Sequence, residues 1–312
     1  ICEGTCERYD WDEATQGFLL SAFYYGYVIT HLPGGLLAEK FGGKWTVGFG
    51  LLLTSVATVL TPWAVTVGGA TGLFIIRVIE GFGEGPVTPA FVLLLARWVP
   101  PSERSRFGAM IFGGAQVGNV FGPYISGLLL ADGGDWANVF YCFGGLGIIW
   151  FIFWVFLCYS TPNSHPFISD EEKEYLNNNI IASGLHKKLD PVPFKALLRS
   201  APLWVLVLAA VTSSIPALFV ILASYSGCNR AEAVGLFIAS MAFMGGFYSS
   251  VKINAMDIAP NYAGTCSAFV NGIAAISGII TPYLIGLLTP DVSIPFLLEL
   301  RFFLYFVTRF FN

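Results

Sequence analysis

The chain has 312 residues, of which 55% are hydrophobic and only 12% are charged. An ordinary soluble domain carries about 25% charged residues, so this composition excludes a soluble globular protein and indicates a membrane protein. The net charge of −4 is small and scattered, which excludes a nucleic-acid-binding protein. The apolar runs are continuous and about 20 residues long, whereas barrel strands alternate over about ten residues. The sequence therefore predicts an all-α, polytopic helical bundle.

Eight apolar runs are long enough to cross a bilayer as helices. In chain order they cover residues 17–38, 46–66, 72–96, 107–131, 138–159, 203–223, 233–252 and 263–288. A ninth run, 294–311, contains Glu299 and Arg301, so it fits a helix lying along the membrane interface as well as one crossing the membrane.

Lysine and arginine residues concentrate in alternate loops. They follow the first, third and fifth runs, while loops 67–71 and 132–137 contain none. Basic loops stay in the cytoplasm, which fixes the orientation of every run. The sequence thus predicts a non-cytoplasmic segment 1–16, an N-terminal helical bundle 17–159, a cytoplasmic linker 160–202 and an incomplete C-terminal helical bundle 203–312.

The linker is the one long polar stretch of the chain. Within it, Ser169 and Glu172 have the spacing of a capping box, in which a serine hydroxyl accepts a hydrogen bond from a backbone N–H three residues later. This spacing predicts a surface helix that begins at Asp170. We interpret the rest of the linker as a solvated connection without chemistry.

The third run carries three charges, in the stretch RVIEGFGEGPVTPA from Arg77 to Ala90. An unpaired charge at the bilayer centre costs about 2.5–3.5 kcal/mol, so these side chains cannot all face lipid. At about 100° per residue Arg77, Glu80 and Glu84 share one stripe, which must face protein or water. We expect Arg77 and Glu80 to form a structural pair between helices. Glu84 falls near mid-depth, where a carboxyl can serve a proton or ion pathway.

The turn after the first run reads GLLAEKFGGK. It resembles the cytoplasmic loop signature of the major facilitator superfamily, in which a glycine precedes an acidic residue, a basic residue, a further glycine and more basic charge. The matching residues are Gly35, Glu39, Lys40, Gly42 and Lys44. Gly43 departs from the signature because it stands where arginine is common.

Glu39 is the acidic residue of this signature. A carboxylate is stabilised beside the positive end of a helix dipole. We therefore expect Glu39 to approach a helix N-terminus, or Arg97 or Arg104, and to help hold the cytoplasmic side closed.

Further segments narrow the resemblance, namely WDEATQGFLLSAFYYGYVITHLPGG, RVIEGFGEGPVTPA, RWVPPSERSR, YSTPNSHPFISDEEKEYL and KINAMDIAPNYAG. Together they resemble the anion–cation symporter branch of that superfamily, which contains sialin, vesicular glutamate transporters and sodium–phosphate cotransporters. The resemblance implies that Glu84 matches the fourth-helix carboxylate implicated in proton coupling, and Arg77 the arginine before it. It also implies a binding or coupling role for Asn254 and a structural role for Asp257, both in the N-x-x-D-I-A-P pattern.

The chain departs from the twelve-helix pattern of this family. It begins at what resembles helix two, and SAPLWVLVLAAVTSS, resembling the start of helix seven, continues directly as IPALFVILASYSGCNR, resembling helix nine. Most of helix seven and all of helix eight are then missing, and the join forms one span of about 21 residues. Leu20 and Ala255 replace two histidines of the vesicular relatives, which argues against vesicular glutamate transport.

These features predict a symporter of organic or inorganic anions, driven by a proton or sodium gradient, in the plasma membrane or a lysosomal or vesicular membrane. Phosphate, sialate, glutamate and urate are all compatible anions. Apart from the coupling ion, H+ or Na+, no cofactor is implied; the partners are a small anion and the lipid bilayer, with the oligomeric state left open. An enzyme is disfavoured because the sequence contains no HExxH motif and no paired intramembrane aspartates. The alternative is a truncated, non-transporting membrane protein or scaffold derived from such a transporter.

Overall fold

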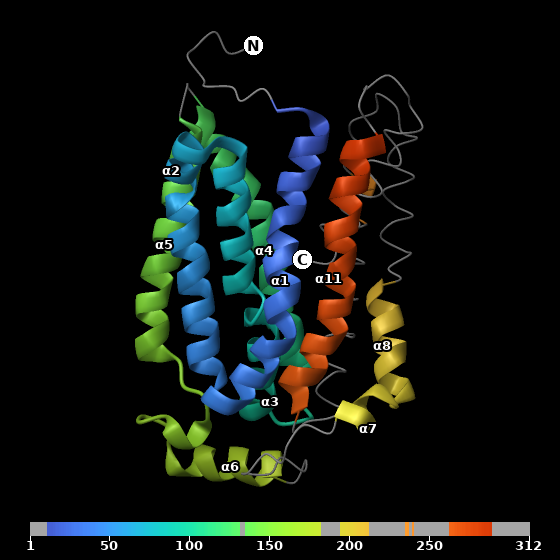
Figure 1. Ribbon diagram of the computed structural model, residues 1–312. Helices are drawn as coiled ribbons and strands as arrows, with labels where there is room; N and C mark the ends of the chain where they lie inside the picture. Colours follow the sequence, from blue (N-terminus) through green and yellow to red (C-terminus); the bar gives the residue numbers. More distant parts are fainter. Residues whose placement is uncertain are drawn as a thin grey trace.

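The computed structural model describes residues 11–131, 135–181, 194–211, 235, 236, 239 and 262–288. These ranges contain helices and turns and no strand, as expected for an all-α bundle. The helices are α1 Glu13–Phe41, α2 Gly43–Glu84, α3 Val87–Trp98, α4 Arg104–Leu130, α5 Trp136–Leu157, α6 Asp170–Ile181, α7 Phe194–Leu198, α8 Ala201–Val211 and α11 Ala263–Leu288. Figure 1 shows the long helices side by side, with α6 lying across one end of the bundle.

Helix α2 is a hairpin of two arms that reverse at a single glycine. Gly69 has φ 54° and ψ −134°, a conformation that only glycine adopts without strain, and the arms on either side cover 43–68 and 70–84. The runs 46–66 and 72–96 are therefore antiparallel neighbours, as predicted, but the reversal replaces the expected loop 67–71. We call these two segments the first and second arms of α2.

The second arm continues into α3 across a short turn at Gly85 and Pro86. Pro86 has no N–H to donate, so the helical ladder is interrupted there and resumes where the Ala90 N–H bonds the Pro86 carbonyl at 3.1 Å. The second arm and α3 together form the charged span expected from the sequence. The break between them comes directly after Glu84.

Helix α1 packs against both α2 and α11, and glycines permit the close approach (Figure 1). A Cβ on Gly26 would collide with the Val78 carbonyl of the second arm. A Cβ on Gly35 would lie 2.9 Å from the Gly264 carbonyl and 3.0 Å from Cβ of Ala268 on α11. At these two positions the helices approach so closely that only glycine fits, while elsewhere Tyr24 and Tyr27 of α1 pack against Ala275 of α11.

Two indole hydrogen bonds fasten one end of the bundle. Trp98 at the end of α3 donates to the Tyr159 carbonyl at 2.8 Å, and Trp154 on α5 donates to the Lys44 carbonyl at 2.8 Å. The Lys44 ammonium also lies 4.4 Å from the centre of the Tyr159 ring. This end carries the basic turns, so we call it the basic end of the bundle.

Several expectations about the elements are confirmed. Helix α6 begins at Asp170, and the Glu172 N–H donates to Oγ of Ser169 at 3.2 Å. Helix α11 has the predicted bounds 263–288. By length and composition, three stretches of the described residues could each cross a membrane: Gly43–Trp98, Trp136–Leu157 and Ala263–Ile280. The runs 233–252 and 294–311 lie almost wholly outside the described residues.

Candidate functional site

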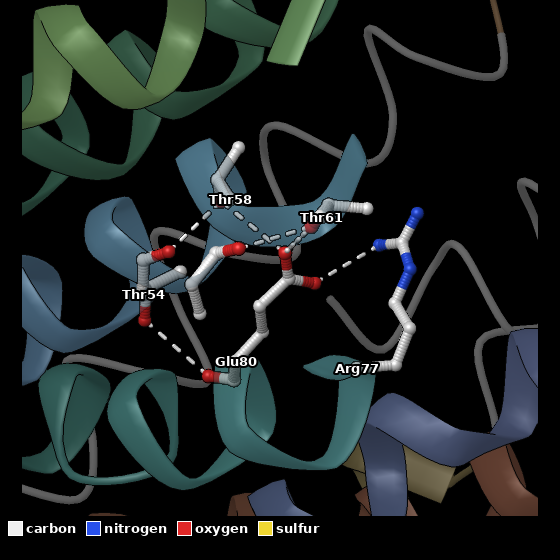
Figure 2. A network of polar contacts seen from close by, with 6 residues as sticks. Thr54, Thr58, Thr61, Arg77 and Glu80 are labelled. Carbon is white, nitrogen blue, oxygen red and sulfur yellow. Dashed lines mark hydrogen bonds and ion pairs between the residues drawn. The ribbon is translucent and has the colours of Figure 1, made fainter. Parts of the chain in front are cut away.

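Glu80 is the centre of a polar cluster between the two arms of α2 (Figure 2). Its side chain is almost fully buried, and its Oε1 accepts hydrogen bonds from the hydroxyls of Thr58 and Thr61, each at 3.3 Å. Oε2 lies 3.3 Å from the Arg77 guanidinium. Both carboxylate oxygens of Glu80 therefore have a partner, which is what a buried charge requires.

The threonines reach Glu80 because they lie one helical turn apart on the first arm. Thr58 and Thr61 are three residues apart, so their side chains project from one face of the helix. Thr54, one turn earlier, donates to the Glu80 backbone carbonyl at 3.3 Å. Each of these hydroxyls also lies 2.8 to 3.1 Å from the carbonyl four residues earlier in its own arm, so its single proton is shared between that carbonyl and Glu80. Figure 2 shows the three threonines of one arm around Glu80 of the other.

Arg77 is only partly engaged by this cluster. Its side chain is 37% exposed, and among the described residues it pairs with the Glu80 carboxylate, three residues along the same helix. A guanidinium has five N–H donors in a planar fork, so most of them stay available to an anion. The pair expected between Arg77 and Glu80 is confirmed, and through the threonines it joins neighbouring helices.

Glu84 shares the Arg77 stripe but stands apart from the pair. It is half-buried at the end of the second arm, directly before the Gly85–Pro86 turn. Among the described residues it has no hydrogen-bond or ion-pair partner. Glu84 is thus a partly buried carboxyl at a helix break, and its coupling role stays a prediction.

Glu39 lies at the basic end and joins α1 to α11. Its Oε1 accepts hydrogen bonds from the backbone N–H of Thr265 at 3.0 Å and from the Thr265 hydroxyl at 2.8 Å. Thr265 is in the first turn of α11, whose N–H groups lack partners within the helix. Arg97 donates to the Glu39 carbonyl at 3.4 Å. The predicted approach of Glu39 to a helix N-terminus is confirmed; its gating role stays a prediction.

The remaining residues of the loop signature build the turn between α1 and α2. Gly42 has φ 92°, in the region that favours glycine, and its N–H bonds the Ala38 carbonyl at 2.9 Å to end α1. Lys40 is exposed, and the Lys44 N–H donates to Oγ of Ser160 at 3.3 Å. The signature thus specifies a turn that is tied to the end of α5. Asn254 and Asp257 lie outside the described residues.

Four residues that complete these contacts were not predicted from the sequence, namely Thr54, Thr58, Thr61 and Thr265. A signal was present for three of them, because Thr54, Thr58 and Thr61 recur at helical spacing within an apolar run. Nothing local marks Thr265, since its role depends on how α11 is placed against α1.

Comparison with known proteins agrees with this architecture. The model of the Major Facilitator Superfamily matches residues 7–229. A putative inorganic phosphate cotransporter of Drosophila ananassae is 32% identical over 361 residues, covering 92% of this chain and 74% of the relative. Sialin of Homo sapiens is 34% identical over 365 residues, covering 93% of this chain and 72% of sialin.

A solved structure shares the fold at low sequence identity. The proton:xylose symporter XylE, bound to 6-bromo-6-deoxy-D-glucose, superposes with a TM-score of 0.64 at 13% identity, covering 96% of this chain and 85% of XylE. The family is one of transporters, which agrees with the expectation that the chain is not an enzyme. The chain is a multi-pass membrane protein of the Major Facilitator Superfamily and belongs to its branch of sialin-like and phosphate-cotransporter-like proteins.

Proposed function

We propose that this chain derives from a symporter of small organic or inorganic anions that works by alternating access and couples to a proton or sodium gradient. The observation that carries the proposal is the Arg77 guanidinium on a membrane-crossing helix. It is 37% exposed and pairs only with Glu80 among the described residues, so most of its N–H donors can bind an anion. The relatives named as a phosphate cotransporter and as sialin support an anion as the substrate. We propose the plasma membrane or a lysosomal or vesicular membrane as its location; some relatives are named as vesicular transporters.

In this proposal Arg77 binds the anion and Glu84 carries the coupling ion. An anion that binds the Arg77 guanidinium competes with the Glu80 carboxylate and offsets the positive charge of Arg77 along its stripe of the helix. Glu84 lies on that stripe, two turns or about 10 Å along the helix. Binding of the anion and of a proton or Na+ then favour each other, which is the linkage that a symporter requires. Asn254 would contribute to the same site, and Glu39 would latch the basic end, with Asp257 in a supporting role.

Uptake into proteoliposomes tests the proposal. An intact transporter that carries these residues is reconstituted, and accumulation of labelled phosphate, sialate or urate is followed with an imposed pH gradient, an imposed sodium gradient, or neither. Gradient-dependent accumulation of one of these anions supports symport. Equal uptake in all three conditions would contradict it.

The second candidate function is a non-transporting membrane protein, and two observations favour it for the 312-residue chain itself. The aligned regions of the relatives, 361 and 365 residues, exceed the length of this chain, so the relatives hold internal residues that it lacks. Among the described residues, a Cβ added at five glycines of α4 would meet no atom within 4 Å: Gly113, Gly114, Gly118, Gly122 and Gly127. Small residues of this kind serve helix packing in membranes. We propose that a further helix packs against this face of α4 in a transport-competent protein.

We therefore expect this chain alone to transport poorly or not at all. We propose that the internal residues it lacks belong to the family's seventh and eighth helices, and that without them lipid or water would enter where a wall of the pathway belongs. The test is the same uptake assay with the 312-residue chain and, in parallel, with a version in which these internal residues are restored. Strong gradient-driven uptake by the short chain would exclude the scaffold alternative.

A further inference from the structure

A groove of about 680 Å3 opens between α1 and the two arms of α2. Its lining is almost wholly apolar and includes Leu37, Phe41, Trp45, Phe49, Leu53 and Phe82. We call it the α1–α2 groove. Its volume falls in the range of about 300–1,000 Å3 that small-molecule sites occupy.

The α1–α2 groove is separate from the anion site. Successive residues of an α-helix are about 100° apart, so Phe82 and Glu84 project about 160° from each other. Phe82 lines the groove, whereas Glu84 shares its stripe with Arg77. The groove therefore faces away from the Arg77 side of the second arm, toward the surroundings of the bundle.

The floor of the groove is formed where the two arms of α2 touch. Gly50 on the first arm and Gly83 on the second both line the groove, and a Cβ on Gly50 would lie 2.5 Å from the Gly83 carbonyl. A side chain at either position would push the arms apart. Because the floor is bare backbone, the bulky residues on the walls enclose a hollow rather than filling it.

Two lysines flank the end of the groove at the basic end of the bundle. The Lys40 ammonium lies 5.3 Å from the centre of the Phe41 ring, and the Lys44 ammonium lies 5.2 Å from the centre of the Trp45 ring. Phe41 and Trp45 are themselves groove residues. Within the described part of the chain neither ammonium forms an ion pair with a carboxylate, so both charges are available to an anion.

We propose that the α1–α2 groove binds an anionic glycerophospholipid from the leaflet at the basic end. Its phosphate lies against Lys40 and Lys44, and an acyl chain lies in the hollow. The direction fits, because the wall from Trp45 to Leu53 runs along the helix axis for about 12 Å from the basic end toward the bilayer centre. A zwitterionic lipid could fill the hollow equally well, but its ammonium would oppose the two lysines.

Native mass spectrometry of the purified chain tests this assignment. The 312-residue protein is equilibrated in detergent with equimolar phosphatidylglycerol and phosphatidylcholine of the same chains, and retained lipids are counted. We expect preferential retention of phosphatidylglycerol. A juxtamembrane lysine contributes about 1 kcal/mol toward anionic lipid, or about fivefold in affinity. Lys40→Gln with Lys44→Gln should then lower phosphatidylglycerol affinity about thirtyfold, while Leu53→Trp should reduce retention of both lipids by filling the hollow.

Matched variants control for charge and bulk. Lys195→Gln with Arg199→Gln removes two positive charges elsewhere, and Leu60→Trp adds an indole on the first arm outside the groove, at an exposure of 44% against 43% for Leu53. Both controls should retain phosphatidylglycerol as the unmodified chain does. Equal retention of the two lipids by the unmodified chain, or equal losses in variants and controls, would overturn the proposal. Displacement by millimolar glycerophosphoglycerol, the headgroup without acyl chains, would also overturn it in favour of a free-anion site.

Discussion

Oε1 of Glu39 accepts two hydrogen bonds from Thr265, one from its backbone N–H and one from its hydroxyl, although the two residues are 226 positions apart in the chain. The contact joins the last turn of α1 to the first turn of α11. Glu39 is almost fully buried there, at 9% exposure, so solvent screens the interaction only weakly. The carboxylate acts as an N-cap contributed by a different helix.

This relationship predicts that Glu39→Ala opens the basic end more often. Loss of an N-cap side chain costs about 1–2 kcal/mol, which corresponds to a five- to thirtyfold larger open population. A cysteine placed at Ala268, which packs on Gly35, reports opening through its rate of alkylation. Glu39→Gln should show a smaller rise because its amide oxygen still accepts hydrogen bonds. An unchanged alkylation rate in both variants would leave Glu39 without a latching role.

The hydrogen bonds from Thr58 and Thr61 to Glu80 predict a loss of stability when one hydroxyl is removed. Thr61→Val keeps the shape of the side chain but leaves Oε1 of Glu80 with Thr58 alone. Hydrogen bonds in membrane proteins contribute about 0.6 kcal/mol on average and up to about 1.7. We expect a destabilisation near the average value, because the single hydroxyl proton of Thr61 is shared with the Ala57 carbonyl at 3.0 Å, measured as the free energy of unfolding in mixed micelles. Thr66→Val, whose exposed hydroxyl bonds only the Trp63 carbonyl, is the control and should be neutral.

In an intact transporter, substitution of Arg77 should impair anion binding, whereas substitution of Glu84 should impair coupling to the gradient. Glu84→Gln should abolish gradient-driven accumulation but leave anion exchange, because a neutral amide cannot take up a proton or a cation's charge. Arg77→Ala should weaken anion binding at least tenfold, since hydrogen bonds to charged groups contribute about 1.5–3 kcal/mol. Arg106→Ala, an exposed arginine at the start of α4, is the charge control. Full pH-driven accumulation by Glu84→Gln would make Glu84 a structural counter-ion.

The contact between α1 and the second arm predicts that Gly26→Ala disrupts packing. The added methyl group would collide with the Val78 carbonyl and lie 2.8 Å from the Phe82 nitrogen, so the helices must separate. Overpacking of this kind costs about 1–3 kcal/mol or more. Gly113→Ala on α4 is the matched control, because its methyl group would meet no atom within 4 Å and alanine favours helix. Similar unfolding free energies for the two variants would contradict this packing.

Local signals in the sequence predicted much of the fold. The apolar runs placed α1, the first arm of α2, the second arm together with α3, α4, α5 and α11 to within a few residues, but not the break after Glu84. The capping box at Ser169 placed the start of α6. These features depend on neighbours within one turn, which the sequence displays directly. The pair Arg77–Glu80 belongs to the same class because its members are three residues apart.

The contacts between residues far apart in the chain could not be predicted from such local signals. Thr61 and Glu80 are 19 residues apart and meet only because the chain reverses at Gly69. The register between the arms depends on that one backbone conformation, and no periodicity encodes it. The partner of Glu39 was predicted as a helix N-terminus, but its identity required the placement of α11. Similarly, the α1–α2 groove arises from backbone contact between glycines that are far apart in the sequence.

The indole bonds at the basic end bear on how the bundle can move. Trp98 and Trp154 clamp α3 and α5 to the segments around Tyr159 and Lys44 through main-chain carbonyls, which remain the same whatever side chains surround them. We expect those helices to move together as one block. The seam between α1 and α11 has no such indole clamp among the described residues; it consists of glycine contacts, a buried cluster of Tyr24, Tyr27 and Ala275, and the hydrogen bonds of Glu39 to Thr265. Any rocking of the two halves would pivot along that seam, leaving the internal geometry of the block unchanged.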